Sequence, residues 1–532
     1  MSMEHLKSLA ARAMVGCVLA AVAFASAASA PPLTPEEQRG RQIYHEGSSP
    51  DGPPISAFVG RSGVKVPAGV LTCASCHGAD GLGRPEGGVE PSNVTWGHLA
   101  TSYGHRHNNG RRHDAFDEIT LGAAIVGQVD PAGNALDPAM PRYEMSAEDL
   151  AALIAYMMRL ESDLDSGLSE TAITLGSVLP SEGPYGPFGR AVAATLRATF
   201  DEINAEGGIY GRRIDLKLVA YEGGPEATAA NARRLVEEER VFAVLGAFAL
   251  GMERELFAVF AEARVPQVDP ITLFAGHEEL QDDSTFFLLS GLSDQARALV
   301  DYAALHLELA PAAVAVVLAD NEIYGDIARA IERQAAARGW PPPSVIRVGA
   351  GRDAAARRLE ELRDSGAEAV FYFGPAEGLN GFAAAAAARD WRPRIFLSGP
   401  IAGRQALGLP AAFQDHVYLA YPNLPGDQSP EGTAAFRALH KKHGLPREHL
   451  AAQVTAYAAA RVLVEGLRRA GRALSREALV AALDGLARLD TGQTPPVSYG
   501  PNRRVGVLGA HVLSVDLEAK RVRPETTWVP LD

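Results

Sequence analysis

The chain has 532 residues, of which 47% are hydrophobic and 21% are charged, and its formal net charge is -14. A chain of this length is too long for one hydrophobic core, so two or three domains are expected. The negative net charge argues against nucleic acid as a partner, because a polyanion would be repelled.

The first 30 residues have the pattern of a signal peptide. A positive region containing Lys7 precedes an uncharged apolar run over residues 13–25, and small-residue triplets end at Ala27 and at Ala30. These triplets match the A-x-A pattern of a signal-peptidase site. We expect cleavage after one of them and a periplasmic location, and a retained membrane anchor is the alternative.

The sequence changes character near residues 163–170. Before this segment the chain is rich in Gly, Pro and His, whereas after it short apolar runs alternate with amphipathic stretches of helix length. Such alternation predicts strands and helices in turn. We therefore expect a first domain over residues 31–162, a polar linker over residues 163–170, and a second domain over residues 171–532.

Two helices can be predicted in the first domain. Thr34 and Pro35 are a suitable N-cap and first helical residue for a helix that ends near Glu46. A second helix begins at Ser146, where apolar residues recur on one face. The chain between them looks mostly irregular, so something else must supply part of the core.

A C-x-x-C-H motif lies between these helices, formed by Cys73, Cys76 and His77. This is the attachment motif of haem c, in which two thiols bind the vinyl groups and the histidine lies beneath the iron. A zinc half-site or a disulfide is the alternative, but no second cysteine pair is present to complete a zinc site. We expect one covalently attached haem c, which would also supply the missing core.

Over residues 34–160 the sequence resembles class I c-type cytochromes. The resemblance depends on the helix with Gly40, on residues 73–83, and on the Met140-Pro141 step ahead of the last helix. It implies that Met140 is the second axial ligand of the haem iron and that the terminal helices cross at the small glycine. Met145 is the rival ligand, although the family has an apolar packing residue there.

This domain departs from the family in one place, and it also contains a group of four histidines. Residues 47–70 form a longer Gly- and Pro-rich insertion, which is expected to cover the haem edge or to dock on the second domain. Four histidines, His98, His105, His107 and His113, lie in a strongly polar stretch. We interpret this stretch as a solvated loop, and the alternative is a second metal site or a bis-histidine haem.

The second domain reads as strand and helix in repetition, which predicts a parallel sheet with helices on both faces. From Thr171 onward several short segments recur in a characteristic order, namely residues 183–186, 202–211, 241–246, 265–266, 324–325 and 456–459. In these segments the domain resembles type I periplasmic binding proteins of the leucine/isoleucine/valine-binding branch. The family implies two doubly wound lobes joined by three crossings, with ligand held at the carboxyl ends of the strands.

The ligand-contact loops differ from those of the amino-acid binders. In those proteins, hydroxyls after the strand ending at Gly246 hold the ligand carboxylate, and an acid after Gly399-Pro400 holds its ammonium group. Residues 247–251 contain no hydroxyl here, and Ile401 stands in place of the acid. A zwitterion would be buried unpaired, so we expect a mostly apolar or aromatic small molecule rather than an α-amino acid. The expected cleft lining is Tyr185, Phe248, Thr272 and Tyr324.

The fold class expected is a mainly α cytochrome c domain followed by an α/β two-lobed binding-protein domain. We interpret the chain as an electron-transfer protein with a periplasmic redox partner and a small-molecule receptor domain. The alternative is a solute receptor of an ABC importer, with an ABC permease as partner and an accessory cytochrome. No G-x-S-x-G, P-loop or Rossmann glycine motif is present, so an enzyme is not expected. Haem-dependent oxidation of a bound ligand stays open.

Overall fold

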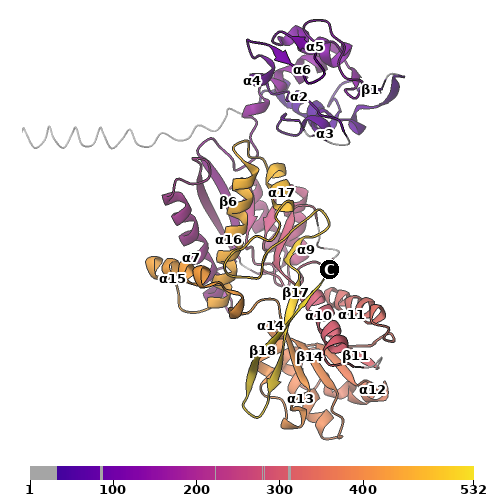
Figure 1. The fold of residues 1–532 in the computed structure, drawn as a ribbon, viewed down its shortest axis with the longest axis vertical. Coiled ribbons are helices and arrows are strands. Elements are labelled where there is room, and N and C mark those ends of the chain that lie inside the picture. Colours follow the sequence, from indigo (N-terminus) through magenta and orange to yellow (C-terminus); the bar gives the residue numbers. More distant parts are fainter. Residues whose placement is uncertain are drawn as a thin grey trace, which may run out of the picture. The chain divides into compact units, whose positions relative to one another are not determined.

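The computed structural model describes residues 33–531 apart from residues 61, 84, 86–87, 222, 278–279, 281 and 310–312. The predicted signal peptide lies outside the described residues. The chain divides into two compact units, one ending at Asp165 and the other beginning at Ser166 (Figure 1). Within the described residues, no helix combines the length and the apolar character needed to cross a bilayer.

The first unit is built around two helices, α2 (Pro35–Glu46) and α6 (Ala147–Met157), which pack against each other. Shorter elements complete it. These are β1 (Ser56–Val59), β2 (Val64–Pro67), α3 (Cys73–His77), α4 (Trp96–Leu99), β3 (His105–Arg106), β4 (Arg112–His113), α5 (Glu118–Gly127) and β5 (Arg142–Glu144), together with the 3-10 turns η1 (Ala68–Val70) and η2 (Leu160–Ser162).

Helix α2 begins and ends where the local chemistry requires it. The hydroxyl of Thr34 accepts a hydrogen bond from the Glu37 amide at 3.2 Å, and the Glu37 carboxylate accepts one from the Thr34 amide at 2.7 Å. This capping box satisfies two amides that have no partner inside the helix. Gly47 ends the helix with a φ of 66°, which is the left-handed conformation that glycine adopts most readily. The predicted helix is confirmed.

The crossing of α2 and α6 requires a glycine at residue 40. A Cβ atom there would lie 2.0 Å from the carbonyl oxygen of Ala152 and 2.7 Å from the Cβ of Tyr156. Both neighbours belong to rigid parts of α6. The two helices therefore approach each other so closely because Gly40 has no side chain.

The insertion over residues 47–70 is not irregular chain. Strands β1 and β2 form an antiparallel hairpin in which Ser56 pairs with Pro67, and β5 pairs with the other edge of β1. The result is a three-stranded sheet within the first unit. Because β5 follows Pro141 directly, this sheet also fixes the chain that leaves Met140.

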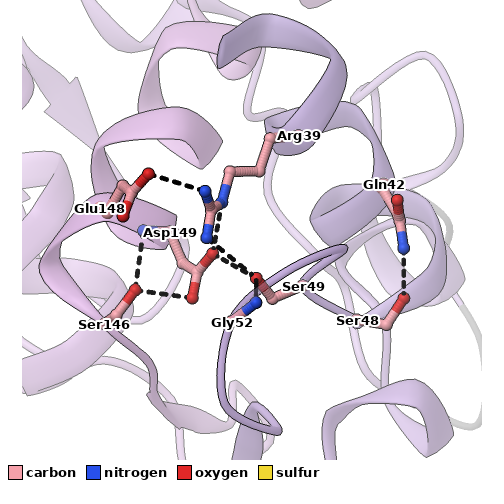
Figure 2. A network of polar contacts seen from close by, with 8 residues as sticks. All are labelled: Arg39, Gln42, Ser48, Ser49, Gly52, Ser146, Glu148 and Asp149. Carbon is pink, nitrogen blue, oxygen red and sulfur yellow. Dashed lines mark hydrogen bonds and ion pairs between the residues drawn. The ribbon is translucent and has the colours of Figure 1, made fainter. Parts of the chain in front are cut away.

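A buried carboxylate ties the start of this insertion to both main helices (Figure 2). The Asp149 side chain has no exposed surface and accepts from Arg39 Nε at 2.8 Å, from the Ser49 hydroxyl at 2.6 Å and from the Ser146 hydroxyl at 2.7 Å. Arg39 also pairs with Glu148 at 2.7 Å. The network joins α2, the insertion and the first turn of α6, and it satisfies a charge that would otherwise be costly to bury.

The described residues of the second unit form two sheets with six and seven strands, and helices pack on both sheets (Figure 1). The six-stranded sheet is parallel throughout, as expected for alternating strands and helices. In the seven-stranded sheet, only the last two strands run antiparallel to their neighbours. The α/β prediction is confirmed.

The strands and helices of the two lobes have the following bounds. In sheet order, the six-stranded sheet contains β16 (Val505–Val507), β10 (Thr285–Leu289), β9 (Gln267–Val268), β8 (Ala243–Leu245), β6 (Ala172–Pro180) and β7 (Arg213–Tyr221). The other contains β12 (Ser344–Val348), β11 (Val314–Ala319), β13 (Ala369–Phe373), β14 (Arg394–Ser398), β15 (Val417–Tyr421), β17 (Gly509–Asp516) and β18 (Arg521–Pro530). The helices are α7 (Gly186–Ala205), α8 (Pro225–Glu237), α9 (Glu253–Glu262), α10 (Leu292–Leu305), α11 (Gly325–Ala337), α12 (Leu359–Asp364), α13 (Ala376–Ala387), α14 (Gly399–Ala406), α15 (Pro430–His443), α16 (Leu450–Ala470) and α17 (Arg476–Asp484).

The chain passes between the two lobes three times. It leaves the first lobe after β10 for α10, which packs on β14, β15 and β17, and it returns after β15 to α15, which packs on α7. The third crossing joins β16 to β17. The Ser290 hydroxyl links the first crossing to the third, because it donates to the Val507 carbonyl at 2.8 Å and accepts from the Gly509 amide at 3.0 Å.

Candidate functional site

The two cysteines of the C-x-x-C-H motif lie on one short helix. The hydroxyl of Thr72 caps α3 by accepting from the Ser75 amide at 3.1 Å, so the helix begins at Cys73. Cys73 and Cys76 are separated by one helical turn and are not joined in a disulfide. Residues three apart lie on the same face of a helix. The motif therefore presents both sulfur atoms from one side of α3.

His77 is held in one tautomer by the chain that follows it. The side chain is buried, and its Nδ1 lies 2.8 Å from the carbonyl oxygen of Ser92. A carbonyl only accepts, so Nδ1 carries the proton and Nε2 presents a lone pair. Burial lowers the pKa of His77, and the bond to Ser92 opposes that shift. The imidazole is thus kept neutral, as an iron ligand must be.

Two tyrosines connect this peptide to the rest of the unit. Tyr44 of α2 donates to the Gly78 carbonyl at 2.8 Å, and Tyr143 of β5 donates to the Leu71 carbonyl at 2.7 Å. Burial, together with the nearby thiols, raises the pKa of Tyr143. Desolvation likewise raises the pKa of Cys73, to about 12. The α3 peptide is therefore fixed on one side by α2 and on the other by the strand that follows Met140.

Both methionines considered as haem ligands pack against the core of the first unit, which Cys73 also contacts. The Met140 backbone is held by Gln128, whose side-chain amide donates to the Met140 carbonyl at 2.5 Å. Met145 directly precedes Ser146, the N-cap of α6. The assignment of Met140 as the distal ligand stays a prediction.

Three of the four histidines lie in or directly beside a short hairpin whose turn is exposed, and His98 lies in α4. Strands β3 and β4 make a small hairpin in which His105 pairs with His113, and His113 is buried. The ring of His98 lies tilted against that of His105, with centroids 4.7 Å apart. Desolvation, with Arg111 and His113 next in order, lowers the pKa of His107 to about 4. The polar turn over residues 108–110 is exposed as predicted, whereas the neighbouring His113 ring is buried against the rings of His105 and His107.

The four predicted cleft residues all follow the carboxyl ends of parallel strands, although they differ in exposure. Tyr185 follows β6 and is 53% exposed, whereas Phe248 follows β8 and is only 1% exposed. The rings of Tyr185, Phe188 and Tyr221 surround Phe248, with centroids 5.2, 6.0 and 5.3 Å away. Phe248 therefore supports an aromatic surface on which Tyr185 is the most exposed ring.

The hydroxyl of Thr272 is already used within the protein. It donates to Glu253 Oε1 at 2.9 Å and accepts from the Phe274 amide at 3.0 Å. Burial raises the pKa of Glu253, while hydrogen bonds from the backbone of Glu253 itself, Thr272 and the backbone of Gly251 lower it. Glu253 is not among the residues expected from the sequence, because the contact loop of the family corresponds to residues 247–251 here. Its signal was an acid two residues beyond that loop, at the start of α9.

The other lobe contributes Tyr324 and lacks the expected acid. Tyr324 is partly buried and packs edge-on against Phe274, with centroids 5.2 Å apart. Burial and the nearby Glu253 carboxylate raise the pKa of Tyr324. Ile401 lies in α14 and is packed against the hydrophobic cores. A separate surface cavity of about 370 Å³, among α7, α15 and α16, is lined by none of the four predicted cleft residues.

Comparison with known families matches both units. The family model for periplasmic binding proteins matches residues 172–516, and the model for cytochrome c matches residues 67–161. The resemblances seen in the sequence are confirmed for both domains.

Relatives and solved structures agree with the larger match. The chain is 26% identical over 355 residues to a protein named Leu/Ile/Val-binding protein BraC3 from Rhizobium johnstonii, covering 63% of this chain and 89% of the relative. A solved branched-chain amino acid ABC transporter protein from Thermus thermophilus with bound valine matches with a TM-score of 0.54 and 19% identity, covering 68% of this chain and 98% of that one. A fatty acid ABC transporter substrate-binding protein from Thermomonospora curvata matches with a TM-score of 0.52 and 18% identity, covering 69% and 94%. At such identities the structural matches establish the fold.

Proposed function

Because this chain belongs to the periplasmic binding protein family and carries a cytochrome c domain on its N-terminal side, we propose that it is an exported haem c electron-transfer protein with a small-molecule receptor unit. The observation that carries the proposal is the arrangement of α3. Two thiols lie one turn apart on a helix, and the next residue, His77, is a neutral imidazole with a directed Nε2 lone pair.

The residues present fit a covalent haem c. Cys73 and Cys76 would hold its vinyl groups and His77 its iron, while Met140 would supply a second ligand to the iron. The bound group would supply a one-electron carrier whose potential a thioether ligand raises. The carbonyl of Ser92 orients the ring of His77. Tyr143 of β5, the strand that follows Met140, donates to the Leu71 carbonyl just before α3.

Haem attachment is tested by denaturing electrophoresis with haem staining of protein made alongside the haem-attachment machinery. The wild-type band is expected to stain, and Cys76→Ala is expected to lose covalent haem. Ser75→Ala is the matched control, because Ser75 lies between the two cysteines and is not expected to attach haem. Its hydroxyl donates to the Thr72 carbonyl instead. A colourless wild-type protein would overturn the haem proposal.

For the receptor unit we propose a ligand that is mostly apolar or aromatic and is not an α-amino acid. Three donors that could hold a ligand carboxylate are already occupied. The Phe248 amide donates to the Val178 carbonyl at 2.8 Å, the Ala249 amide donates to the Ile271 carbonyl at 3.0 Å, and the Thr272 hydroxyl donates to Glu253. A second carboxylate placed beside Glu253 would be repelled and left without donors.

The receptor unit also offers no acid at Ile401 for the ammonium group of an amino acid. Each lost charge-assisted hydrogen bond removes about 1.5–3 kcal/mol. Two such losses would weaken a micromolar ligand to roughly millimolar or worse, because each 1.4 kcal/mol is a factor of ten. The exposed ring of Tyr185 would instead stack on an aromatic ligand, which adds about 0.5–1.5 kcal/mol.

Calorimetry with leucine, valine and a panel of uncharged aromatic compounds tests this ligand class. Wild-type protein is expected to bind an aromatic compound and to show no micromolar binding of leucine or valine. Tyr185→Ala is expected to weaken aromatic binding about tenfold. Tyr210→Ala is the control, because Tyr210 is similarly exposed but bonds to the Arg468 carbonyl on α16. Micromolar leucine binding would refute the proposed class.

An ABC-importer receptor is the second candidate, favoured by the relatives named as Leu/Ile/Val-binding and ABC transporter proteins. An ABC permease would then be the partner in place of a periplasmic redox protein. A strain lacking this chain separates the two candidates once a ligand is known. If the Cys76→Ala protein restores uptake of that ligand fully, the receptor acts in import and the cytochrome is accessory. If it fails although it still binds the ligand, electron transfer is the function.

A further inference from the structure

The histidine hairpin of the first unit has no role in the proposed haem site. In its antiparallel pairing, His105 faces His113 and Arg106 faces Arg112. Side chains alternate along a strand, so His107 shares a face with His105, while the two arginines lie on the opposite face. The ring of His113 lies 5.1 Å from the ring of His105 and 5.1 Å from that of His107. Imidazoles therefore gather on one face of the hairpin, and the exposed arginines point away from them.

Two nitrogen atoms of this cluster point directly at each other. His107 Nε2 lies 2.9 Å from His113 Nε2. His113 Nδ1 lies 2.8 Å from the Asp114 carbonyl oxygen, which can only accept, so Nδ1 carries the proton. The Nε2 atom of the buried His113 therefore carries no proton, and its lone pair faces His107 Nε2. A backbone carbonyl that orients the second ring nitrogen in this way is a common feature of histidines that bind metal ions.

A hydrogen bond from His107 to His113 would account for the short distance by itself. It would not account for His105 and His98, whose rings extend the same cluster. His105 has a different partner, since its Nε2 lies 3.2 Å from the Leu99 carbonyl oxygen. The cluster thus contains one pair of facing nitrogens and further imidazoles that border it.

We propose that His107 and His113 bind a divalent transition-metal ion through their Nε2 atoms. With metal–nitrogen distances of about 2.0–2.1 Å, a separation of 2.9 Å corresponds to an angle of roughly 90° at the metal. That angle fits neighbouring positions of a tetragonal site better than a tetrahedral one, which favours Cu²⁺ or Ni²⁺ over Zn²⁺. On binding, the proton of His107 moves from Nε2 to Nδ1, and no electron is transferred.

The remaining positions of the metal would be filled by water. Among the residues that the structure describes, no group of three or more His, Cys, Asp or Glu side chains is placed to bind a metal ion together. Asp130, the nearby acid, is held by Arg111 at 3.1 Å and by Asn134. A two-histidine site with water ligands is therefore accessible to exchange, unlike a closed structural site.

Metal analysis of the full-length haem protein tests the proposal. The protein is dialysed against Cu²⁺ in the presence of a weak competing chelator, and copper is measured by mass spectrometry relative to haem iron. About one copper per haem is expected in the wild type. His107→Gln should lose it, because the amide can still donate to the His113 lone pair but is a poor ligand for Cu²⁺.

His105→Ala is the matched control, since its ring borders the pair but bonds to the Leu99 carbonyl, and it should retain the copper. An unchanged haem spectrum in both variants shows that the unit is folded. Should either variant lose that spectrum, His107→Asn and His105→Gln repeat the comparison with smaller changes of structure. Copper that persists in the His107 variant, copper lost equally from the His105 variant, or a wild type without copper would each overturn the proposal.

Discussion

Replacement of Gly40 by alanine tests how tightly the two main helices of the cytochrome unit are packed. An added Cβ would lie 2.0 Å from the Ala152 carbonyl oxygen, whereas ordinary contact begins near 3.4 Å. The backbone of α6 must therefore retreat by about 1.4 Å, and a gap of 0.5–1 Å already forfeits a quarter to a half of each dispersion contact. We expect overpacking to lower the free energy of unfolding by up to about 3 kcal/mol. The better helix propensity of alanine offsets about 1 kcal/mol of this loss. The net loss is about 2 kcal/mol.

Urea unfolding followed at the haem Soret band measures this loss for the cytochrome unit alone. In thermal unfolding, the midpoint temperature of this unit should be roughly 8 °C lower in Gly40→Ala than in the wild type. Gly122→Ala is the matched control in α5, because its Cβ would meet only the side-chain ends of Ile154 and Leu150, at 3.5 and 3.6 Å. That variant should be unchanged or more stable by up to about 1 kcal/mol. If the Gly40 and Gly122 variants were equally stable, the close crossing would be refuted.

Further predictions concern the buried carboxylate and the axial ligand. Arg39→Met should destabilise the unit by about 3 kcal/mol in urea unfolding, because it strands the Asp149 charge with only hydroxyl donors; a loss below 1 kcal/mol would contradict this reasoning. Burial alone would raise the pKa of Asp149, but the hydrogen bonds from Ser146, Ser49 and Arg39 together with the charge of Arg39 lower it overall. The stabilisation that the Asp149 carboxylate provides is therefore fully present above the usual carboxyl pKa of about 3.9. It is lost as the pH falls through the lower pKa that Asp149 has in the folded protein. The stability difference between wild type and Asp149→Asn should shrink in that range, and a constant difference would speak against it. Met140→Ala should abolish the thioether–ferric haem charge-transfer band, while Met145→Ala should keep it; the reverse result would identify Met145 as the ligand.

Much of the organisation of this protein is determined by local sequence. The capping box at Thr34 and Glu37 depends on residues three apart, and the spacing of the C-x-x-C-H motif is set by one turn of helix. The alternation of apolar runs and helix-length stretches likewise predicts the parallel sheets of the second unit, because each pattern is short and periodic. Gly40 could be placed at the helix crossing through the resemblance to cytochromes.

Other features were decided only by contacts between residues distant in the chain. The insertion over residues 47–70 joins a sheet because β1 pairs with β5, which lies more than 80 residues later. A polar composition suggested a solvated stretch around His113, yet strand pairing buries that ring among other imidazoles. Thr272 was predicted as a ligand contact, and the fold places its hydroxyl within hydrogen-bond distance of Glu253. In each case the side chain's role depends on a partner brought to it by the tertiary fold, and no local pattern encodes that partner.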